Sequence, residues 1–160
     1  MRRFKNKYIT PKKPWDKARI LEEKEIMKVY GLKNKKEIWK VEAYIKKLRE
    51  IAKKLIVASP EEQKKFIARL AEYGFISPDA TLDDVLALDK RKILDRRLQT
   101  VVYKLGLANT IKQARQFIVH GHVMLRGRKI NVPSYLVKLE EEKDISLSDK
   151  VSKVLKTKQA

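Results

Sequence analysis

The most regular pattern of apolar and polar residues in the chain lies between Lys36 and Val57. Apolar side chains recur there at steps of three and four residues, which lines them along one face of a helix. They are Ile38, Val41, Ile45, Leu48, Ala52 and Leu55, and four lysines gather on a different face, namely Lys36, Lys40, Lys47 and Lys54. The pattern predicts a helix packed on one side, whose basic side either follows RNA phosphates or is simply solvated.

Local start and stop signals predict shorter helices around this one. A serine followed by proline, with glutamate three residues after the serine, marks a helix N-terminus, and a glycine after the last apolar residue marks a C-terminus. These signals predict helices at 18–30 before Gly31 and from Ser59 to Gly74, and short helices that start at 77–78 and 81–84. We therefore expect the N-terminal part to be mostly helical.

Helix and strand patterns are mixed after Lys90. A helix is followed by a second one, which a capping box opens and His120-Gly121-His122 ends, and then by a hairpin with its turn at Arg126-Gly127. The expected elements are a helix at 96–105 with Leu98, Val101, Val102 and Leu105 inward, a helix from Thr110, and strands at 123–125, 128–130, 134–138 and 144–147. The predicted fold class is α+β, a mostly helical N-terminal part followed by two helices packed on a small antiparallel sheet.

Charge narrows the choice of partner. The chain has 39 Lys and Arg against 20 Asp and Glu, a formal net charge of +19, and so favours a polyanion such as nucleic acid. An anionic membrane is the competing partner, but no apolar run approaches the ~20 residues that span a bilayer, and the N-terminus lacks an apolar signal core. We expect a soluble, cytoplasmic RNA-binding protein with no membrane partner.

The chemistry-bearing residues argue against catalysis and cofactors. Cysteine is absent, and the chain has two histidines, His120 and His122, with no third metal ligand or nucleophile motif nearby. Helix termination and a hydrogen bond from His120 to RNA are therefore favoured over a metal site or a general base. Neither the G-x-x-x-x-G-K nor the G-x-G-x-x-G phosphate loop occurs. We expect no cofactor, no metal and no enzymatic activity.

The first twenty residues form a separate basic segment. Phe4, Tyr8 and Trp15 alternate with cations, as in an arm that follows a phosphate backbone and offers rings for stacking. A disordered solubilising tail is the alternative. The candidate RNA contacts of this arm are Arg2, Arg3, Lys5, Lys7, Lys12 and Lys13.

Three motifs of the C-terminal half resemble the S-four RNA-binding domain: RRLQTVVYKLGLA at 96–108, ARQFIVHGHV at 114–123 and PSYLV at 133–137. Upstream, GLKNKKEIWK at 31–40 and LDDVLAL at 82–88 are similar to the archaeal and eukaryotic branch of the small-subunit ribosomal protein family that named the domain. The resemblance implies direct binding to small-subunit ribosomal RNA early in assembly, neighbouring small-subunit ribosomal proteins, a place near incoming messenger RNA, and an effect on translational accuracy.

The resemblance also implies that the second helix and the hairpin meet RNA phosphates and sugars, and that they recognise the shape of a folded junction rather than a base sequence. The candidate RNA-binding residues of the module are Arg97, Lys104, Thr110, Lys112, Gln113, Arg115, Gln116, His120, Arg126, Arg128 and Lys129.

The chain departs from the family pattern at two places. Arg126 stands before the turn glycine, where the family usually has Asn, so a positive φ there would cost modest strain unless the turn type differs, and its charge could reach phosphate instead. The acidic segment 139–144 replaces a Gly-Asp turn and is not expected to face RNA.

The predicted domains are a basic arm at 1–20, a helical domain at 21–94, the S-four module at 95–148 and a basic tail at 149–160. The expected function is that of a structural constituent of the small ribosomal subunit. An RNA-modifying enzyme would need a catalytic domain, which the helical part does not provide. A free RNA chaperone that binds stalled ribosomal particles is the second alternative.

Overall fold

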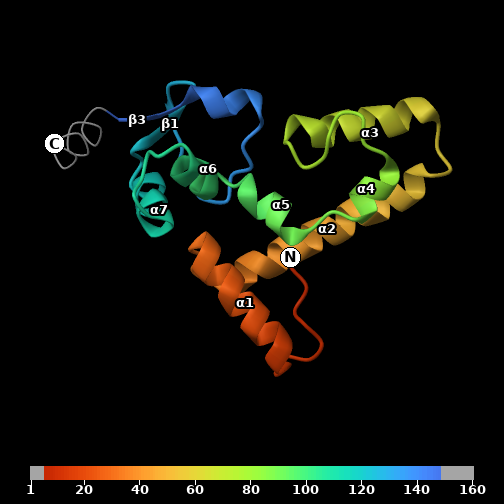
Figure 1. Ribbon diagram of the computed structural model, residues 1–160, viewed down its shortest axis with the longest axis horizontal. Coiled ribbons are helices and arrows are strands. Elements are labelled where there is room, and N and C mark those ends of the chain that lie inside the picture. Colours follow the sequence, from red (N-terminus) through yellow and green to blue (C-terminus); the bar gives the residue numbers. More distant parts are fainter. Residues whose placement is uncertain (1–5, 149–160) are drawn as a thin grey trace, which may run out of the picture. The chain divides into compact units, whose positions relative to one another are not determined.

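Seven α-helices and a three-stranded antiparallel sheet make up the described part of the chain, residues 6–148 of a computed structural model (Figure 1). This arrangement confirms the predicted α+β class. The described residues divide into two compact units, residues 6–71 with 75–94 and residues 72–74 with 95–148. The limits of the functional domains stay a prediction, and the basic tail at 149–160 lies outside the described residues.

The first unit is organised around its longest helix, α2, against which α1 and α4 pack (Figure 1). The predicted apolar stripe of α2 is buried from Ile38 to Ala52, and Leu55 is half-buried. Burial of these side chains removes apolar surface from water, which is the main force holding the unit together. The helices of this unit are α1 (Lys17–Tyr30), α2 (Lys35–Leu55), α3 (Pro60–Glu72), α4 (Leu82–Leu86) and the start of α5 (Lys90–Asp95).

Most of the predicted helix ends are confirmed, and one predicted helix is wrong. Gly31 caps α1 in the left-handed region, at φ 56°, where its N–H donates to the carbonyl of Met27. That conformation is open to glycine at no steric cost. Residues 77–80 form a turn instead of the helix expected from 77–78, because the N–H of Ala80 donates back to the carbonyl of Ser77 and no further helical bond follows.

Lys90 joins three elements of the first unit through two ion pairs. Its Nζ lies 3.0 Å from Glu22 on α1 and 3.1 Å from Glu42 on α2. Burial alone would lower the pKa of Lys90, but the two carboxylates outweigh burial, and the pKa is raised. Lys90 therefore stays charged where α5 begins.

The second unit packs α6 (Leu98–Lys104) and α7 (Ile111–Val119) side by side. The sheet has the order β2-β1-β3, with Leu125 paired to Arg128 on one side and to Ile145 on the other. The predicted strand at 144–147 is thus confirmed. The strands are β1 (Val123–Leu125), β2 (Arg128–Lys129) and β3 (Ile145–Leu147), and the 3-10 helix η1 (Glu140–Asp144) precedes β3.

Two predictions for this unit need correction. Residues 134–138 form no strand of the sheet, because their backbone bonds to the segment that leads into α6: Leu98 N–H donates to Tyr135 and Val137 N–H to Arg96. This pairing holds Arg97 in an extended conformation, so α6 starts at Leu98 instead of residue 96.

Leu105, expected to point inward, is 41% exposed. It occupies the C-cap of α6, where the backbone leaves the helical path and turns the side chain away from the inner face. Ala108 is buried in the core, and Leu107 packs against it, so the apolar contact is supplied three residues later.

No helix of the described residues is long and apolar enough to cross a bilayer.

Candidate RNA-binding surface

The first turn of α7 is shaped by the capping box expected from the sequence, with one changed partner. Thr110 accepts a hydrogen bond from the N–H of Gln113 at 3.2 Å. The Gln113 side chain accepts in return from the N–H of Asn109 at 2.9 Å, one residue before the cap. Two helix-terminal N–H groups are thereby satisfied. Lys112 and Gln116 lie four residues apart on this helix, and both are exposed.

Arg115 of α7 is held by a residue that the sequence analysis did not select. Its Nη1 donates to Oε1 of Gln99 at 3.1 Å, and Nε2 of Gln99 donates to the carbonyl of Ile111 at 3.1 Å. Gln99 lies on α6 and is 1% exposed. A buried amide bonded at both ends orients the guanidinium and connects α6 to the first turn of α7. No local signal marks Gln99, since its burial depends on the packing of α7.

The hairpin turn has positive φ at both central residues, although Arg stands before the glycine where the family usually has Asn. Arg126 has φ 48° and Gly127 φ 74°, and the flanking Leu125 and Arg128 are paired. Two consecutive positive φ values are those of a type I′ turn, the form that suits the twist of a two-residue hairpin. Arg126 is the one non-glycine residue with positive φ among those described, so the expected strain is present.

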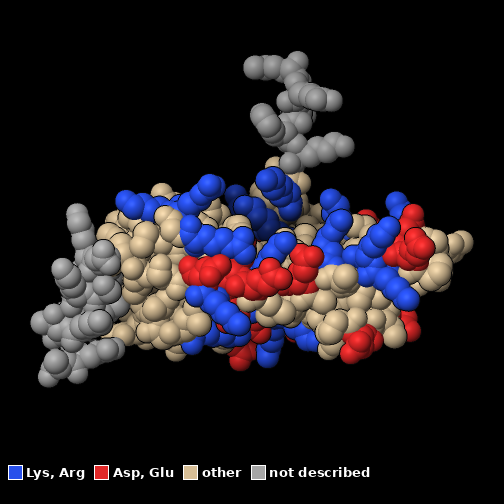
Figure 2. All heavy atoms as spheres, turned by 90° about the horizontal axis from the view of Figure 1, so that it is seen from above, with Lys and Arg blue, Asp and Glu red and all other residues tan. Residues whose placement is uncertain are grey.

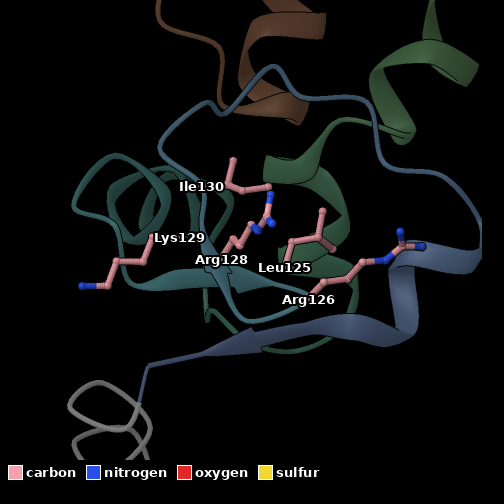
Figure 3. A pocket seen from close by; sticks show the side chains of 5 residues that line it. All are labelled: Leu125, Arg126, Arg128, Lys129 and Ile130. Carbon is pink, nitrogen blue, oxygen red and sulfur yellow. The ribbon is translucent and has the colours of Figure 1, made fainter.

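The side chain of Arg126 extends toward Asp144 at the end of η1, although 57% of it stays exposed (Figure 3). Its Nε lies 3.1 Å from Oδ2 of Asp144, and the backbone N–H of Arg126 donates to the backbone carbonyl of Asp144 at 3.3 Å. Both side chains are half-exposed, which limits the stabilisation from this ion pair to well under about 1 kcal/mol. Asp144 thus pairs with the Arg126 guanidinium, which was expected to contact phosphate.

Arg128 and Lys129 carry the remaining charge of the hairpin. Both are exposed, and as neighbours on a strand they point away from each other (Figure 3). Together with Arg126 they line an open depression whose apolar wall is Leu125 and Ile130. A surface of this kind offers cations to phosphates and an apolar wall to a sugar or a base.

The two histidines follow the end of α7. Their rings are stacked, 6.3 Å between centroids and 19° between planes. His120 is exposed, whereas His122 is half-buried, edge-on to Phe117 and 3.5 Å from Oγ of Ser148. Within residues 6–148 no group of three His, Asp or Glu side chains is placed to hold a metal ion. His120 is thus the more exposed of the two histidines, and its contact with RNA stays a prediction.

Two other candidates of the module are engaged by the protein itself. Arg97 is 4% exposed, and its backbone pairs with that of Leu136 in an isolated β-bridge. Its predicted contact with RNA is therefore corrected, because the side chain lies inside the protein. Lys104 is exposed and lies 3.1 Å from Asp95. An exposed pair of this kind is weak and leaves the lysine able to exchange partners.

The acidic segment after the module's third motif, which was not expected to face RNA, has partners within the chain. Glu141 is buried and accepts hydrogen bonds from the Tyr135 hydroxyl, at 3.0 and 3.2 Å. Burial and this carboxylate both raise the pKa of Tyr135, which keeps the hydroxyl protonated as a donor. Glu142 lies 2.8 Å from Arg96. These pairs position η1, and through it Asp144.

Candidates on the first unit lie on α2 and on the segment before α1. The four candidate lysines of α2 are exposed, and Lys36 also lies over the ring of Tyr8, 5.9 Å from its centroid. Figure 2 shows Lys and Arg side chains at many places on one view of the chain, with Asp and Glu side chains between them. The exposed candidates of the first unit are Lys7, Lys12, Lys13, Lys36, Lys40, Lys47 and Lys54, whereas Arg2, Arg3 and Lys5 lie outside the described residues.

Comparison with known proteins identifies the family. The S4 domain family matches residues 96–143, the segment that forms this surface. Small ribosomal subunit protein uS4 of Methanococcus aeolicus is 52% identical over 150 residues, which cover 91% of this chain and 85% of the relative. The chain belongs to the uS4 family. Its uS4 relatives in Hyperthermus butylicus and Nanoarchaeum equitans are 50% and 47% identical, over 86% and 91% of this chain and 81% and 84% of their own.

The uS4 assignment confirms the resemblance drawn from the sequence motifs and extends it over most of the chain. These uS4 relatives are ribosomal proteins and not enzymes, as the absence of catalytic motifs predicted. The S4 domain covers α6, α7, the hairpin and nearly all of η1, so the residues held by Gln99 and Asp144 fall within it.

Proposed function

We propose that this chain is a structural constituent of the small ribosomal subunit and binds small-subunit rRNA directly. The observation that carries the proposal is the likeness to a small ribosomal subunit protein across 91% of the chain. That likeness spans the helical unit as well as the S4 domain. The proposal therefore concerns the whole chain and not merely an RNA-binding module that many proteins share.

The S4 domain supports this function by holding cations at defined places. Arg115 is oriented by Gln99, and Arg128 is carried on a hairpin with a two-residue turn. Double-helical RNA displays phosphates and 2′-hydroxyls more readily than base edges, so cations at fixed spacings recognise its shape. We expect the target to be a folded junction of the rRNA, contacted by α7 and the hairpin.

Arg126 has a different part in this proposal from Arg128. Because Asp144 pairs with its guanidinium, Arg126 shapes the turn, and Arg128 is the phosphate contact of the hairpin. Lys112, Gln116, His120 and Lys129 are exposed around these two elements and complete the contact surface.

The finer roles that the family resemblance implies belong to the same proposal. The basic face of α2 would hold further rRNA, and neighbouring small-subunit proteins would pack on surfaces that RNA leaves uncovered. Direct rRNA binding early in assembly, contact with messenger RNA where it enters, and an influence on translational accuracy would follow from that position. We expect the chain on cytoplasmic ribosomes.

Binding to the source organism's small-subunit rRNA tests the proposal, against an unrelated folded RNA of equal length at low and near-physiological salt. The parent chain should keep its preference for the rRNA as salt rises. Arg115→Gln should weaken rRNA binding about tenfold and reduce the salt slope by about one counterion, because one phosphate contact is lost.

Arg69→Gln is the matched control, since Arg69 is exposed on α3, outside both proposed surfaces. Equal loss of both RNAs with salt in the parent chain would show that charge alone binds them. Sedimentation of the cellular protein with dissociated large subunits instead of small ones would favour the stalled-particle chaperone.

A further inference from the structure

Trp15 is a large aromatic side chain that the fold fixes at its backbone and leaves uncovered. It is 82% exposed. Pro14 precedes it and restricts the backbone, and Asp16 follows it as the N-cap of α1, accepting a hydrogen bond from the N–H of Ala18 at 3.2 Å. The indole therefore projects from a backbone that is held on both sides.

Arg19 strengthens this hold from inside α1. Its Nη2 donates to the carbonyls of Lys13 and Pro14, at 3.0 and 3.3 Å, directly before the tryptophan. Its Nε lies 3.8 Å from Glu23, which is 2% exposed. This ion pair is long and has no hydrogen bond, so the arginine holds the backbone that carries Trp15 through its two bonds to the carbonyls.

Tyr8, on the same segment, has a different environment. Its ring packs against Trp39, 6.0 Å between centroids, and lies under Lys36. Trp39 in turn donates from Nε1 to Glu23 at 2.9 Å. Tyr8 and Trp39 are thereby used within the protein, whereas 82% of the surface of Trp15 remains available to a partner.

The charge around Trp15 indicates what that partner is. Lys12, Lys13 and Lys17 are exposed close to it in sequence, and the one acid of the segment, Asp16, caps α1. An apolar pocket of another protein would fit the indole but would not require three cations beside it. A nucleic-acid base stacks on an aromatic face while flanking phosphates meet lysines.

We propose that Trp15 is a stacking platform for one unpaired base of the small-subunit rRNA, with Lys12 and Lys13 on the adjoining phosphates. This inference rests on the proposed function and adds a specific contact outside the S4 domain. It separates the aromatic residues of the N-terminal segment by role: Tyr8 anchors the segment, and Trp15 binds.

Affinity of the full-length chain for the small-subunit rRNA tests the inference in three variants. Trp15→Leu keeps an apolar side chain but removes the ring, and it should bind about tenfold more weakly, the size expected for one stacked base. Trp15→Phe should keep most of the affinity. Ile9→Ala is the matched control, because it removes a 60% exposed apolar side chain without a ring from the same segment, and its affinity should equal that of the parent.

Fluorescence provides a direct readout, since the chain has two tryptophans, Trp15 and Trp39. Stacking should quench the parent when rRNA is added, and Trp15→Phe should lose most of that quenching. Thermal unfolding should be unchanged in all three variants.

Unchanged affinity and quenching in Trp15→Leu and Trp15→Phe, with a parent that still prefers the rRNA, would overturn this inference and leave the proposed function standing. If Trp15→Leu binds rRNA normally but fails to enter small subunits, the indole instead docks on a protein, which also overturns it. A parent without preference for the rRNA overturns the proposed function and this inference together.

Discussion

Arg115 of α7 and the candidate lysines of α2 differ in exposure and in how they are held: Arg115 is half-buried, and the lysines are exposed. Arg115 is bound by a buried glutamine, which also bonds the first turn of its own helix. Within residues 6–148, the side chains of Lys40, Lys47 and Lys54 make no hydrogen bond or ion pair. A held guanidinium can recognise one arrangement of phosphates, whereas a mobile lysine adapts to many. Shape selectivity should therefore come from the S4 domain, and charge-driven affinity should be shared by both surfaces.

Gln99→Leu should have the largest effect on the difference between the two surfaces, because it removes the residue that holds Arg115. The change leaves the Ile111 carbonyl and the Arg115 guanidinium without their amide partner, which should lower the free energy of unfolding by about 1–3 kcal/mol. Chemical denaturation measures that loss. The preference for rRNA over an unrelated folded RNA should also fall about tenfold, because Arg115 loses the amide bond that orients it.

The salt slope separates the two effects of Gln99→Leu. It should stay at the parent value, since no cation is removed. A variant that keeps its full preference for the rRNA would show that Arg115 needs no positioning.

Lys90→Met tests whether the ion-paired lysine of the first unit contributes to folding stability and not to RNA binding. Loss of the pairs with Glu22 and Glu42 should cost about 1 kcal/mol at pH 7, measured by denaturation. The pKa of Lys90 is raised above 10.5 in the folded chain, so its stabilising effect is complete below that pH and is lost as pH rises through the folded pKa.

The difference in stability between the parent and Lys90→Met should therefore be constant from pH 7 to 9 and shrink above about pH 10.5. Lys92→Met is the control, because Lys92 is exposed on the same helix, and it should leave stability unchanged. A difference that grows with rising pH would contradict the role assigned to the ion pairs.

Lys47→Gln should have a smaller and less selective effect. Removing one unheld cation of α2 should weaken binding to rRNA and to the unrelated RNA alike, by about threefold, and reduce the salt slope for both by up to one counterion. Filter binding over a series of salt concentrations measures both quantities. Selective loss of rRNA binding would instead give α2 a share in shape recognition.

Arg126→Asn should change least. Asparagine accepts a positive φ more readily than arginine, and the exposed pair with Asp144 contributes little, so the two effects should cancel to within about 0.5 kcal/mol. Binding to rRNA should also be unchanged, because Asp144 already holds the guanidinium. If affinity falls severalfold, Arg126 leaves Asp144 in the complex and contacts phosphate.

Much of the fold could be predicted because its signals are local. The stripe from Ile38 to Ala52, the cap at Gly31 and the hairpin at Arg126-Gly127 each depend on residues a few positions apart. At residues 134–138 the prediction was wrong because a distant segment decided the outcome: they bond to the chain before α6 and not to the sheet.

The candidate surface stays a prediction, and the sequence did not indicate which of its side chains are buried or paired. A motif at 96–108 contains Arg97 and Gln99 with nothing to separate an exposed cation from a buried one. Only packing shows that Arg97 is internal and that Gln99 holds Arg115. In the same way, a basic arm with interleaved rings does not reveal that Tyr8 is covered and Trp15 exposed.

The sequence by itself determined the class of this protein: its basic charge, its helix periods, its turns and the family to which its motifs belong. The tertiary structure alone decided which charged side chains are paired, which residues pair with them, and which aromatic ring remains exposed. The physical reason is distance along the chain. Helix and turn preferences depend on neighbouring residues, whereas burial and hydrogen bonding of a side chain depend on elements that folding brings to it, as α7 is brought to Gln99 and Asp144 to Arg126.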